Sequence, residues 1–162
     1  MKKDFLALTD FSREELLAFV DRASKLKAMR KKGIVHQPLK GKTLGMIFKK
    51  PSTRTRISFE VGMIDLGGHP LFLASEQLQL KRGETHADSA RVLSRYLDGI
   101  MIRTFDFNEV LEIARHASIP VIIGLTDLNH PAQVLSDVLT VKEKLGRIKG
   151  VKVAYVGDGN NV

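Results

Sequence analysis

A short run of polar residues, 51–56, combines residue types that bind phosphate. It is Pro-Ser-Thr-Arg-Thr-Arg, and it lies between an apolar run typical of a buried strand and a run with helical spacing of apolar residues. A turn at that place meets the free N–H groups and the positive end of a helix dipole, which both favour an anion. Ser52, Thr53 and Thr55 each supply a hydroxyl donor, and Arg54 can clamp phosphate oxygens bidentately. An ordinary Ser/Thr helix cap beside two solvated arginines accounts for one hydroxyl, not for three.

Two further groups of donors follow apolar runs that have the length of buried strands. Arg103 ends an Ile-Met-Ile run, and His130, in His-Pro-Ala-Gln, opens the segment after another apolar run. A guanidinium at the end of a buried strand costs desolvation unless an anion or a carboxylate meets it. Two plainer interpretations stay open: Arg103 pairs with Asp106 or Asp127, and His130 is a helix cap or a loop residue.

Taken together, these donors suit a substrate that carries both a phosphate and a carbonyl group. Donors on the phosphate would neutralise a leaving group, while Thr55, Arg103 and His130 could polarise a carbonyl oxygen as a nucleophile attacks its carbon. Neither a carboxylate pair nor the serine, histidine and aspartate order of a hydrolase accompanies them. The five histidines are scattered without metal-ligand spacing, so we expect no metal.

The segments that must position these residues alternate between strand-like and helix-like patterns. Ser12 and Glu15 form a capping box, which predicts an amphipathic helix up to Gly33. The apolar patterns then predict strands at 43–48, 70–74, 99–103 and 121–125, and helices at 53–66, 85–97, 107–117 and 131–145. Such repeated units predict an α/β fold, a doubly wound parallel sheet of about four strands with helices on both faces. Ligands of these sheets bind outside the carboxyl ends of the strands, where all three groups of donors fall.

The C-terminal segment predicts the beginning of a second domain. Residues 151–156 have the pattern of another strand, and the Gly-Asp-Gly-Asn-Asn run after them is typical of a turn that leads into a helix. A strand with no crossover after it suggests the first strand of a second α/β domain. We therefore expect one domain over residues 1–150, the start of another over 151–162, and a longer parent enzyme.

Composition narrows the classes of function. The chain has 162 residues, of which 43% are hydrophobic, no cysteine and a formal net charge of +8. This is typical of a globular protein without disulfides or a cysteine-based metal site. The basic residues cluster near expected helix C-termini and are not interleaved with aromatics, which argues against nucleic-acid binding. Because no apolar leader or long apolar stretch is present, we expect no membrane association and a cytoplasmic location.

In order and in residue types, the three groups of donors resemble the signatures of the aspartate/ornithine carbamoyltransferase family. The run Ser-Thr-Arg-Thr-Arg at 52–56, after Lys-Pro and before Ile-Ser-Phe-Glu, is similar to the family's carbamoyl-phosphate loop. Arg103 and the His-Pro-x-Gln run at 130–133 are similar to its other two signatures. The resemblance spans the whole chain, but it covers only the family's carbamoyl-phosphate domain and the first strand of its amino-acid domain.

This resemblance implies a role for each matching residue. Arg54, Arg103 and His130 would be catalytic. The residues that would bind carbamoyl phosphate are Ser52, Thr53, Arg54 and Thr55 at the phosphate, Thr55, Arg103 and His130 at the carbamoyl oxygen, and Gln133 at the carbamoyl nitrogen.

Two more residues match positions that lie outside the three signatures. Gln79 resembles a glutamine of the loop through which a neighbouring subunit completes each carbamoyl-phosphate site, and Asn161 resembles an asparagine that touches the amino-acid substrate. Family members are trimers, so the resemblance implies a homotrimer or a multiple of trimers with shared sites. Gln79 and the residues around 91–96 and 125–127 are most similar to the ornithine branch of the family.

The implied reaction moves the carbamoyl group of carbamoyl phosphate to the δ-amine of L-ornithine, giving L-citrulline and phosphate in arginine metabolism without a cofactor. Three positions depart from the family pattern. Ala132 stands where cysteine or threonine is common, Lys49 replaces a residue that is often acidic, and Lys81 replaces one that is often glycine. One alternative is a sister carbamoyltransferase that uses aspartate, N-acylated ornithine or putrescine. Another, from a different class, is a module that binds carbamoyl phosphate and trimerises without catalysis.

Overall fold

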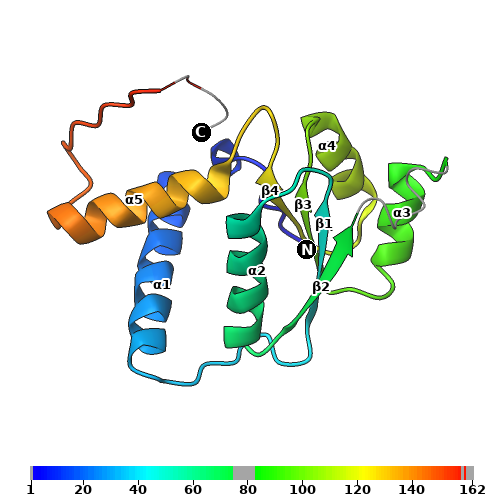
Figure 1. Ribbon diagram of the computed structural model, residues 1–162, viewed down its shortest axis with the longest axis horizontal. Helices are drawn as coiled ribbons and strands as arrows, with labels where there is room; N and C mark the ends of the chain where they lie inside the picture. The colour runs from blue at the N-terminus through cyan, green and yellow to red at the C-terminus, as the bar shows by residue number, and fades with distance from the viewer. Residues whose placement is uncertain (1, 75–82, 158, 160–162) are drawn as a thin grey trace.

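The computed structural model describes residues 2–74, 83–157 and 159, and it has a parallel sheet at its centre (Figure 1). The strands are β1 (Thr43–Phe48), β2 (His69–Ala74), β3 (Gly99–Arg103) and β4 (Val121–Leu125). The helices are a short 3-10 helix η1 (Leu8–Asp10), α1 (Arg13–Lys31), α2 (Thr53–Asp65), α3 (His86–Leu93), α4 (Phe107–His116) and α5 (Pro131–Leu145). None of the helices in these ranges combines the length and the apolar composition that a membrane crossing needs.

The four strands lie in the order β2-β1-β3-β4, and each neighbouring pair is parallel. The connection from β1 leads to β2 on one side of the sheet, and the connection from β3 leads to β4 on the other side. The strand order therefore reverses between the two central strands, β1 and β3. Their register places Phe48, the last residue of β1, beside Arg103, the last residue of β3. The carboxyl ends of β1 and β3 therefore meet at the point where open α/β sheets bind their ligands.

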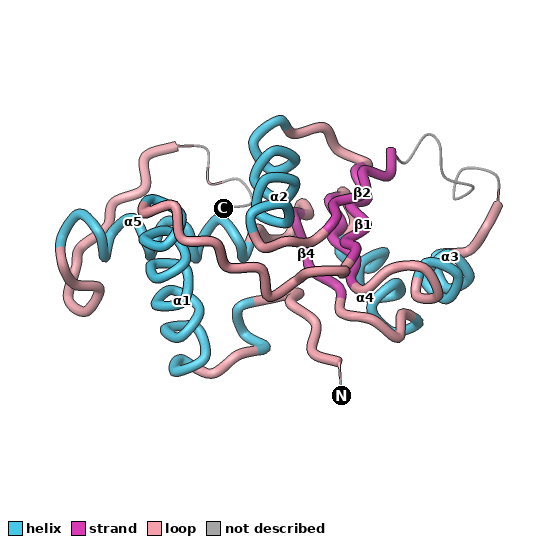
Figure 2. The backbone as a smooth tube through the Cα atoms, turned by 90° about the horizontal axis from the view of Figure 1, so that it is seen from below, coloured by secondary structure: helices cyan, strands magenta, loops and turns pink. Residues whose placement is uncertain are grey.

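Helices cover both faces of the sheet, as Figure 2 shows. In β1 the side chain of Ile47 packs toward α3 and α4, whereas Leu44 and Met46 pack toward Met63 of α2. The same alternation occurs in β3, where Ile102 and Met101 face opposite clusters. Successive side chains of a strand point to opposite faces, so an apolar run without polar interruptions builds a core on each side.

The N-terminal segment and α1 pack at the β4 side of the molecule. Phe5 exchanges backbone hydrogen bonds with Val121 and Ile123 and so extends the edge of β4 by a single bridge. The rings of Phe5, Phe11 and Phe19 cluster with centroids 5.2–6.0 Å apart. Helix α1 then lies against α5 (Figure 1). The amphipathic pattern of α1 predicts a buried apolar face, but only Val20 on this helix is fully buried.

Most predicted elements agree with the structure within one or two residues, and the doubly wound parallel sheet is confirmed. The helix predicted at 85–97 is the main difference, since α3 ends at Leu93 and the chain turns tightly through residues 94–97. This turn brings Leu97 into the core beside Gly45, where a Cβ atom would clash with the leucine side chain. The need to fill that space outweighs the helical periodicity.

The strand predicted at residues 151–156 is absent from the structure. The segment has no regular secondary structure, and its side chains are almost all exposed, including Tyr155 and Val156. A β-strand is stabilised by hydrogen bonds to a neighbouring strand, and no strand of the described ranges lies beside this one. The apolar alternation was therefore insufficient by itself to form a strand here.

Candidate functional site

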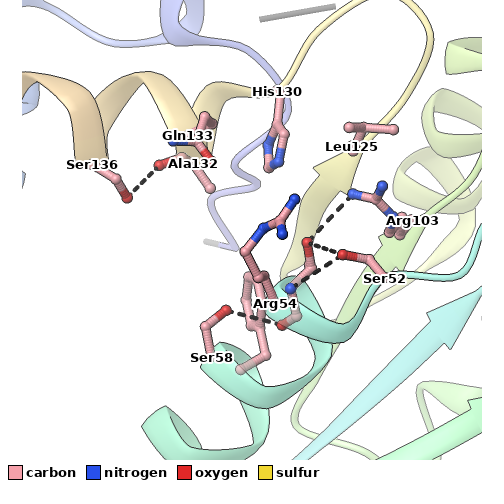
Figure 3. Close-up of a pocket in the computed structure, with 11 residues that line it drawn as sticks. Ser52, Arg54, Ser58, Arg103, Leu125, His130, Ala132, Gln133 and Ser136 are labelled. Carbon is pink, nitrogen blue, oxygen red and sulfur yellow. Dashed lines mark hydrogen bonds between the residues drawn. The ribbon is translucent and has the colours of Figure 1, made fainter.

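A cavity of about 410 Å³ lies at the carboxyl edge of the sheet, between the N-termini of α2 and α5. Its walls come from the turn after β1, from the last residue of β3 and from the β4–α5 connection. Figure 3 shows the side chains of Arg54, Arg103 and His130 extending toward one another from these three regions. The topology has thus brought together the three groups of donors that are far apart in the sequence.

Ser52 and Thr55 organise the N-terminus of α2. The Ser52 hydroxyl accepts a hydrogen bond from the Thr55 N–H at 3.2 Å, as an N-cap does, and donates to the Thr55 hydroxyl at 3.0 Å. The Thr55 hydroxyl oxygen also accepts from Nη1 of Arg103 at 3.3 Å. A hydroxyl group has two acceptor sites and one proton, so the Thr55 proton remains available to donate into the cavity.

Arg103 is a buried cation beside a second cation. Its side chain is held by a hydrogen bond from Nε to the Lys50 carbonyl oxygen at 3.2 Å, and only 9% of the residue is exposed. Burial, and then the positive charge of Arg54, lower the pKa of Arg103 from its ordinary value. Two guanidiniums that share a partly buried space favour the binding of an anion between them.

The plainer interpretation of Arg103 as the partner of a nearby aspartate is wrong. Asp106 caps α4 through a hydrogen bond from the Asn108 N–H, and Asp127 pairs with Lys50 at 3.2 Å. Among the described residues, no carboxylate forms an ion pair with either Arg54 or Arg103. The positive charge of the cavity is therefore not neutralised from within these parts of the chain.

His130 occupies the N-cap position of α5 but caps nothing with its side chain. Its Nδ1 atom is buried and has no hydrogen-bond partner among the described residues. Burial, together with the nearby Arg103 cation, lowers the pKa of His130 from 6.5, and the Asp137 carboxylate opposes this only in part. The imidazole is therefore neutral at pH 7 and offers one donor nitrogen and one acceptor nitrogen.

Gln133 lies one turn into α5 at the exposed rim of the cavity. Its Nε2 donates to Oδ1 of Asp137 at 2.9 Å. A carboxylate only accepts hydrogen bonds, so this contact determines which end of the amide is the nitrogen and leaves the amide oxygen available to accept. The oxygen suits a ligand that carries an NH₂ group.

The structure places the sequence-predicted residues as follows. Those that line the cavity are Ser52, Arg54, Thr55, Arg103, His130 and Gln133. Thr53 is the first residue of α2 and its side chain does not line the cavity. Gln79 and Asn161 lie outside the described residues, so their predicted roles stay predictions.

Sequence reasoning missed several residues of the cavity wall. Phe59 and Leu125 supply apolar wall, while Ser58 and Ser136 direct their hydroxyls to backbone carbonyls of their own helices. Asp137 was also missed. Its spacing of four residues from Gln133 on a helix was the available signal, because such pairs lie on one face.

Chemically, the cavity presents hydroxyl, guanidinium, imidazole and amide groups, and no carboxylate from the described part of the chain lines it. No group of three or more His, Asp or Glu residues in the described ranges is arranged to hold a metal ion. The helix N-terminus and Arg54 suit a phosphate, while the Thr55 hydroxyl, Arg103 and the neutral His130 suit a polarised carbonyl oxygen.

The fold is that of a known family. Residues 3–143 match the family model described as aspartate/ornithine carbamoyltransferase, carbamoyl-P binding domain. The chain belongs to the aspartate/ornithine carbamoyltransferase family, and the resemblance seen in its three groups of donors is confirmed.

Individual relatives agree with this assignment. The chain is 59% identical over 160 residues to the ornithine carbamoyltransferase of Oceanobacillus iheyensis, covering 99% of this chain and 50% of that protein. Ornithine carbamoyltransferase from Pyrococcus furiosus has a similar structure, with a TM-score of 0.96 and 56% identity, over 99% of this chain and 51% of that one. The catalytic subunit of M. jannaschii aspartate transcarbamoylase is more distant, with a TM-score of 0.85 and 32% identity over 92% of this chain and 49% of that one. The chain therefore spans about half the length of the relatives it matches.

Proposed function

We propose that this chain is the carbamoyl-phosphate-binding part of an ornithine carbamoyltransferase. The reaction moves the carbamoyl group of carbamoyl phosphate to the δ-amine of L-ornithine and releases L-citrulline and phosphate, as a step of arginine biosynthesis. Support for ornithine rather than aspartate comes from sequence identity. Relatives named for ornithine are 34–60% identical to this chain, whereas the aspartate transcarbamoylases of M. jannaschii and Trypanosoma cruzi are 32% and 30% identical.

The single observation that carries the proposal is the convergence of donors with no carboxylate among the described residues that line the cavity. The phosphate of the ligand lies at the N-terminus of α2 against Arg54, and the hydrogen bonds of Ser52 hold the first turn of this helix in place. The carbamoyl oxygen accepts hydrogen bonds from the Thr55 hydroxyl, Arg103 and His130, and the carbamoyl NH₂ donates to Gln133. These contacts suit carbamoyl phosphate because its dianionic phosphate and its neutral carbamoyl group meet separate sets of donors and acceptors.

Catalysis follows from the same arrangement. The unprotonated amine attacks the carbamoyl carbon, the bond from this carbon to the bridging phosphate oxygen breaks, and the departing phosphate takes up the proton that the amine nitrogen loses. Negative charge grows on the carbamoyl oxygen and on the departing phosphate, and both are already faced by cationic or neutral donors. Arg54, Arg103 and His130 therefore act by electrostatic stabilisation and positioning.

Other features of the family complete the proposal. We propose a homotrimer or multiple of trimers in the cytoplasm, in which Gln79 of one subunit reaches the carbamoyl phosphate of its neighbour. Residues 1–150 form the carbamoyl-phosphate domain and residues 151–162 begin the amino-acid domain, where Asn161 contacts ornithine. Because the chain spans about half the length of its ornithine relatives, we propose that the chain alone binds carbamoyl phosphate without transferring its carbamoyl group.

A calorimetric titration of the chain with carbamoyl phosphate tests the site. We expect saturable binding that is tighter than the binding of inorganic phosphate. Arg54→Ala and Arg103→Ala should each weaken it by about 10- to 100-fold, since a hydrogen bond to a charged group contributes about 1.5–3 kcal/mol.

Arg56→Ala is the matched control for these variants. Arg56 is the next arginine of the same motif, but it pairs with Glu60 and stacks on Phe72, and it does not line the cavity. We expect its affinity to stay within about twofold of the parent, because one arginine is removed in each case but only Arg54 faces the ligand. A folded parent chain that binds neither carbamoyl phosphate nor phosphate would contradict the proposal.

A further inference from the structure

Glu109, on the first turn of α4, connects the ends of the two central strands. One carboxylate oxygen, Oε1, accepts from Nζ of Lys49 at 2.8 Å, and the other, Oε2, accepts from the Thr104 hydroxyl at 2.5 Å. Lys49 is the residue after β1, and Thr104 is the residue after β3. Glu109 itself does not line the cavity. Its two oxygens therefore hold two segments that lead into the site from different strands.

These two segments also hold Arg103. The Lys49 N–H donates to the Arg103 carbonyl oxygen at 2.9 Å, and the Lys50 carbonyl oxygen accepts from Nε of Arg103 at 3.2 Å. On the other side, the Thr104 N–H donates to the Leu125 carbonyl oxygen at 3.0 Å, which ties β3 to β4. Glu109 therefore binds Lys49, the residue before Lys50, and Thr104, the residue after Arg103.

The cluster around Glu109 is largely shielded from water. The side chains of Lys49 and Glu109 are 21% and 25% exposed, and Thr104 is fully buried. Burial acts to raise the pKa of Glu109, but the hydrogen bonds from Lys49 and Thr104 outweigh it and hold this pKa below its ordinary 4.5. A carboxylate that keeps its charge in such surroundings needs both partners in place, which makes the geometry of the cluster well defined.

Arg103 needs such a restraint because it lies beside a second cation. Arg54 and Arg103 are close enough for the charge of one to lower the pKa of the other, and like charges repel the segments that carry them. The Lys49–Glu109 pair and the Thr104–Glu109 hydrogen bond oppose that separation from the α4 side of the sheet. They lie behind the site, so they can act without contacting a ligand.

We propose that Glu109 is a positioning residue, which sets the place of the Arg103 guanidinium relative to the phosphate-binding turn. The identity of the ligand rests on the proposed function, but the inference that Glu109 positions Arg103 does not. His86 and Glu112 are the other titratable groups of the cluster. His86 lies 3.2 Å from Nζ of Lys49, and its other ring nitrogen lies 3.6 Å from Glu112.

The test uses Glu109→Gln and Lys49→Met, which remove charge with little change of shape, and the double variant. Glu112→Gln is the matched control, because it removes the same group one turn along α4, where the carboxylate is 45% exposed and, among the described residues, pairs with His86 alone. Two quantities are measured: the hydrogen-exchange rate of the Arg103 Nε–H in the ligand-free chain by NMR, and the calorimetric affinity for carbamoyl phosphate.

We expect Glu109→Gln to speed exchange of the Arg103 Nε–H and to weaken carbamoyl-phosphate binding about tenfold, because a misplaced guanidinium loses its alignment with the ligand. Lys49→Met should act in the same direction. The double variant should bind carbamoyl phosphate no more weakly than the more damaging single variant, because both substitutions remove the same Lys49–Glu109 interaction. Glu112→Gln should leave both quantities within about twofold of the parent.

The two readouts separate the possible failures. If Glu109→Gln lowers the melting temperature but leaves both the Nε–H exchange and the affinity unchanged, Glu109 is only a structural ion pair and the inference is overturned. If the parent binds no carbamoyl phosphate, the proposed function fails, and the Nε–H exchange in the ligand-free variants still decides whether Glu109 positions Arg103.

Discussion

At pH 7 the imidazole of His130 is neutral, because burial and the Arg103 cation lower its pKa from 6.5. The unfolded chain takes up a proton at this residue near pH 6.5, whereas the folded chain does so only at lower pH. The unfolded state then binds more protons, so the free energy of unfolding falls as the pH drops through 6.5 and stops falling below the folded pKa. We expect His130→Gln to reduce that fall, as measured by urea unfolding at about pH 7.5, 6.5 and 5.5.

A direct titration of His130 by NMR is the control for this prediction. Its pKa should lie below 6.5 in the parent and should rise in Arg103→Met, because the variant removes a neighbouring positive charge. A His130 pKa above 6.5 in the parent, or one that does not respond to the loss of Arg103, would contradict the electrostatic description of the cavity.

At the scale of elements, the N-termini of α1 and α2 offer a matched pair of caps. Ser12 and Ser52 each accept a hydrogen bond from the N–H three residues along, at 3.2 Å in both helices. Ser12→Ala and Ser52→Ala should therefore each lower the free energy of unfolding by about 1 kcal/mol. Only Ser52→Ala should also weaken carbamoyl-phosphate binding. Of these two helices α2 is the one that begins at the cavity, and Ser52, unlike Ser12, donates a hydrogen bond to Thr55.

Chemical unfolding and calorimetry of the two variants make this comparison. Equal losses of affinity in both would mean that binding merely follows stability. An unchanged affinity in Ser52→Ala would show that the Ser52 hydroxyl and its contact with Thr55 do not contribute to the anion site.

At the scale of the whole molecule, stability is unevenly distributed. The central strands β1 and β3 are buried on both faces, whereas α1 buries only Val20. Helix α1 is joined to α5 by exposed ion pairs, Lys27 with Glu143 and Lys142 with Asp21, and such pairs contribute about 1 kcal/mol or less. Amide hydrogen exchange should therefore be slowest in β1 and β3 and faster by about two orders of magnitude or more in α1. Equal protection in α1 and β3 would contradict this description.

Much of the fold was predictable because local signals were strong. The capping box of Ser12 and Glu15 marked the start of α1, and the runs that became β1, β3 and β4 were apolar at every residue between their two ends. The end of α3 was not predictable, since the tight turn after Leu93 depends on the space that Gly45 leaves for Leu97. The strand pattern at 151–156 was misleading, because pairing with a neighbour, which a periodic pattern does not report, decides whether a strand forms.

By itself, the sequence determined the kinds of donor in the site and their order along the chain. The hydroxyls and arginines of residues 52–56, Arg103, and His130 with Gln133 were all recognisable from residue type and from the apolar runs before them. Only the tertiary structure decided which of them meet. Parallel pairing in register set Arg103 beside the end of β1. The fold left Thr53 out of the cavity wall. It also placed Glu109 behind the site, where its two oxygens accept hydrogen bonds from the residues that follow the two central strands. The physical reason is that residue chemistry is local, whereas distances between segments remote in sequence are determined by the packing of the whole sheet.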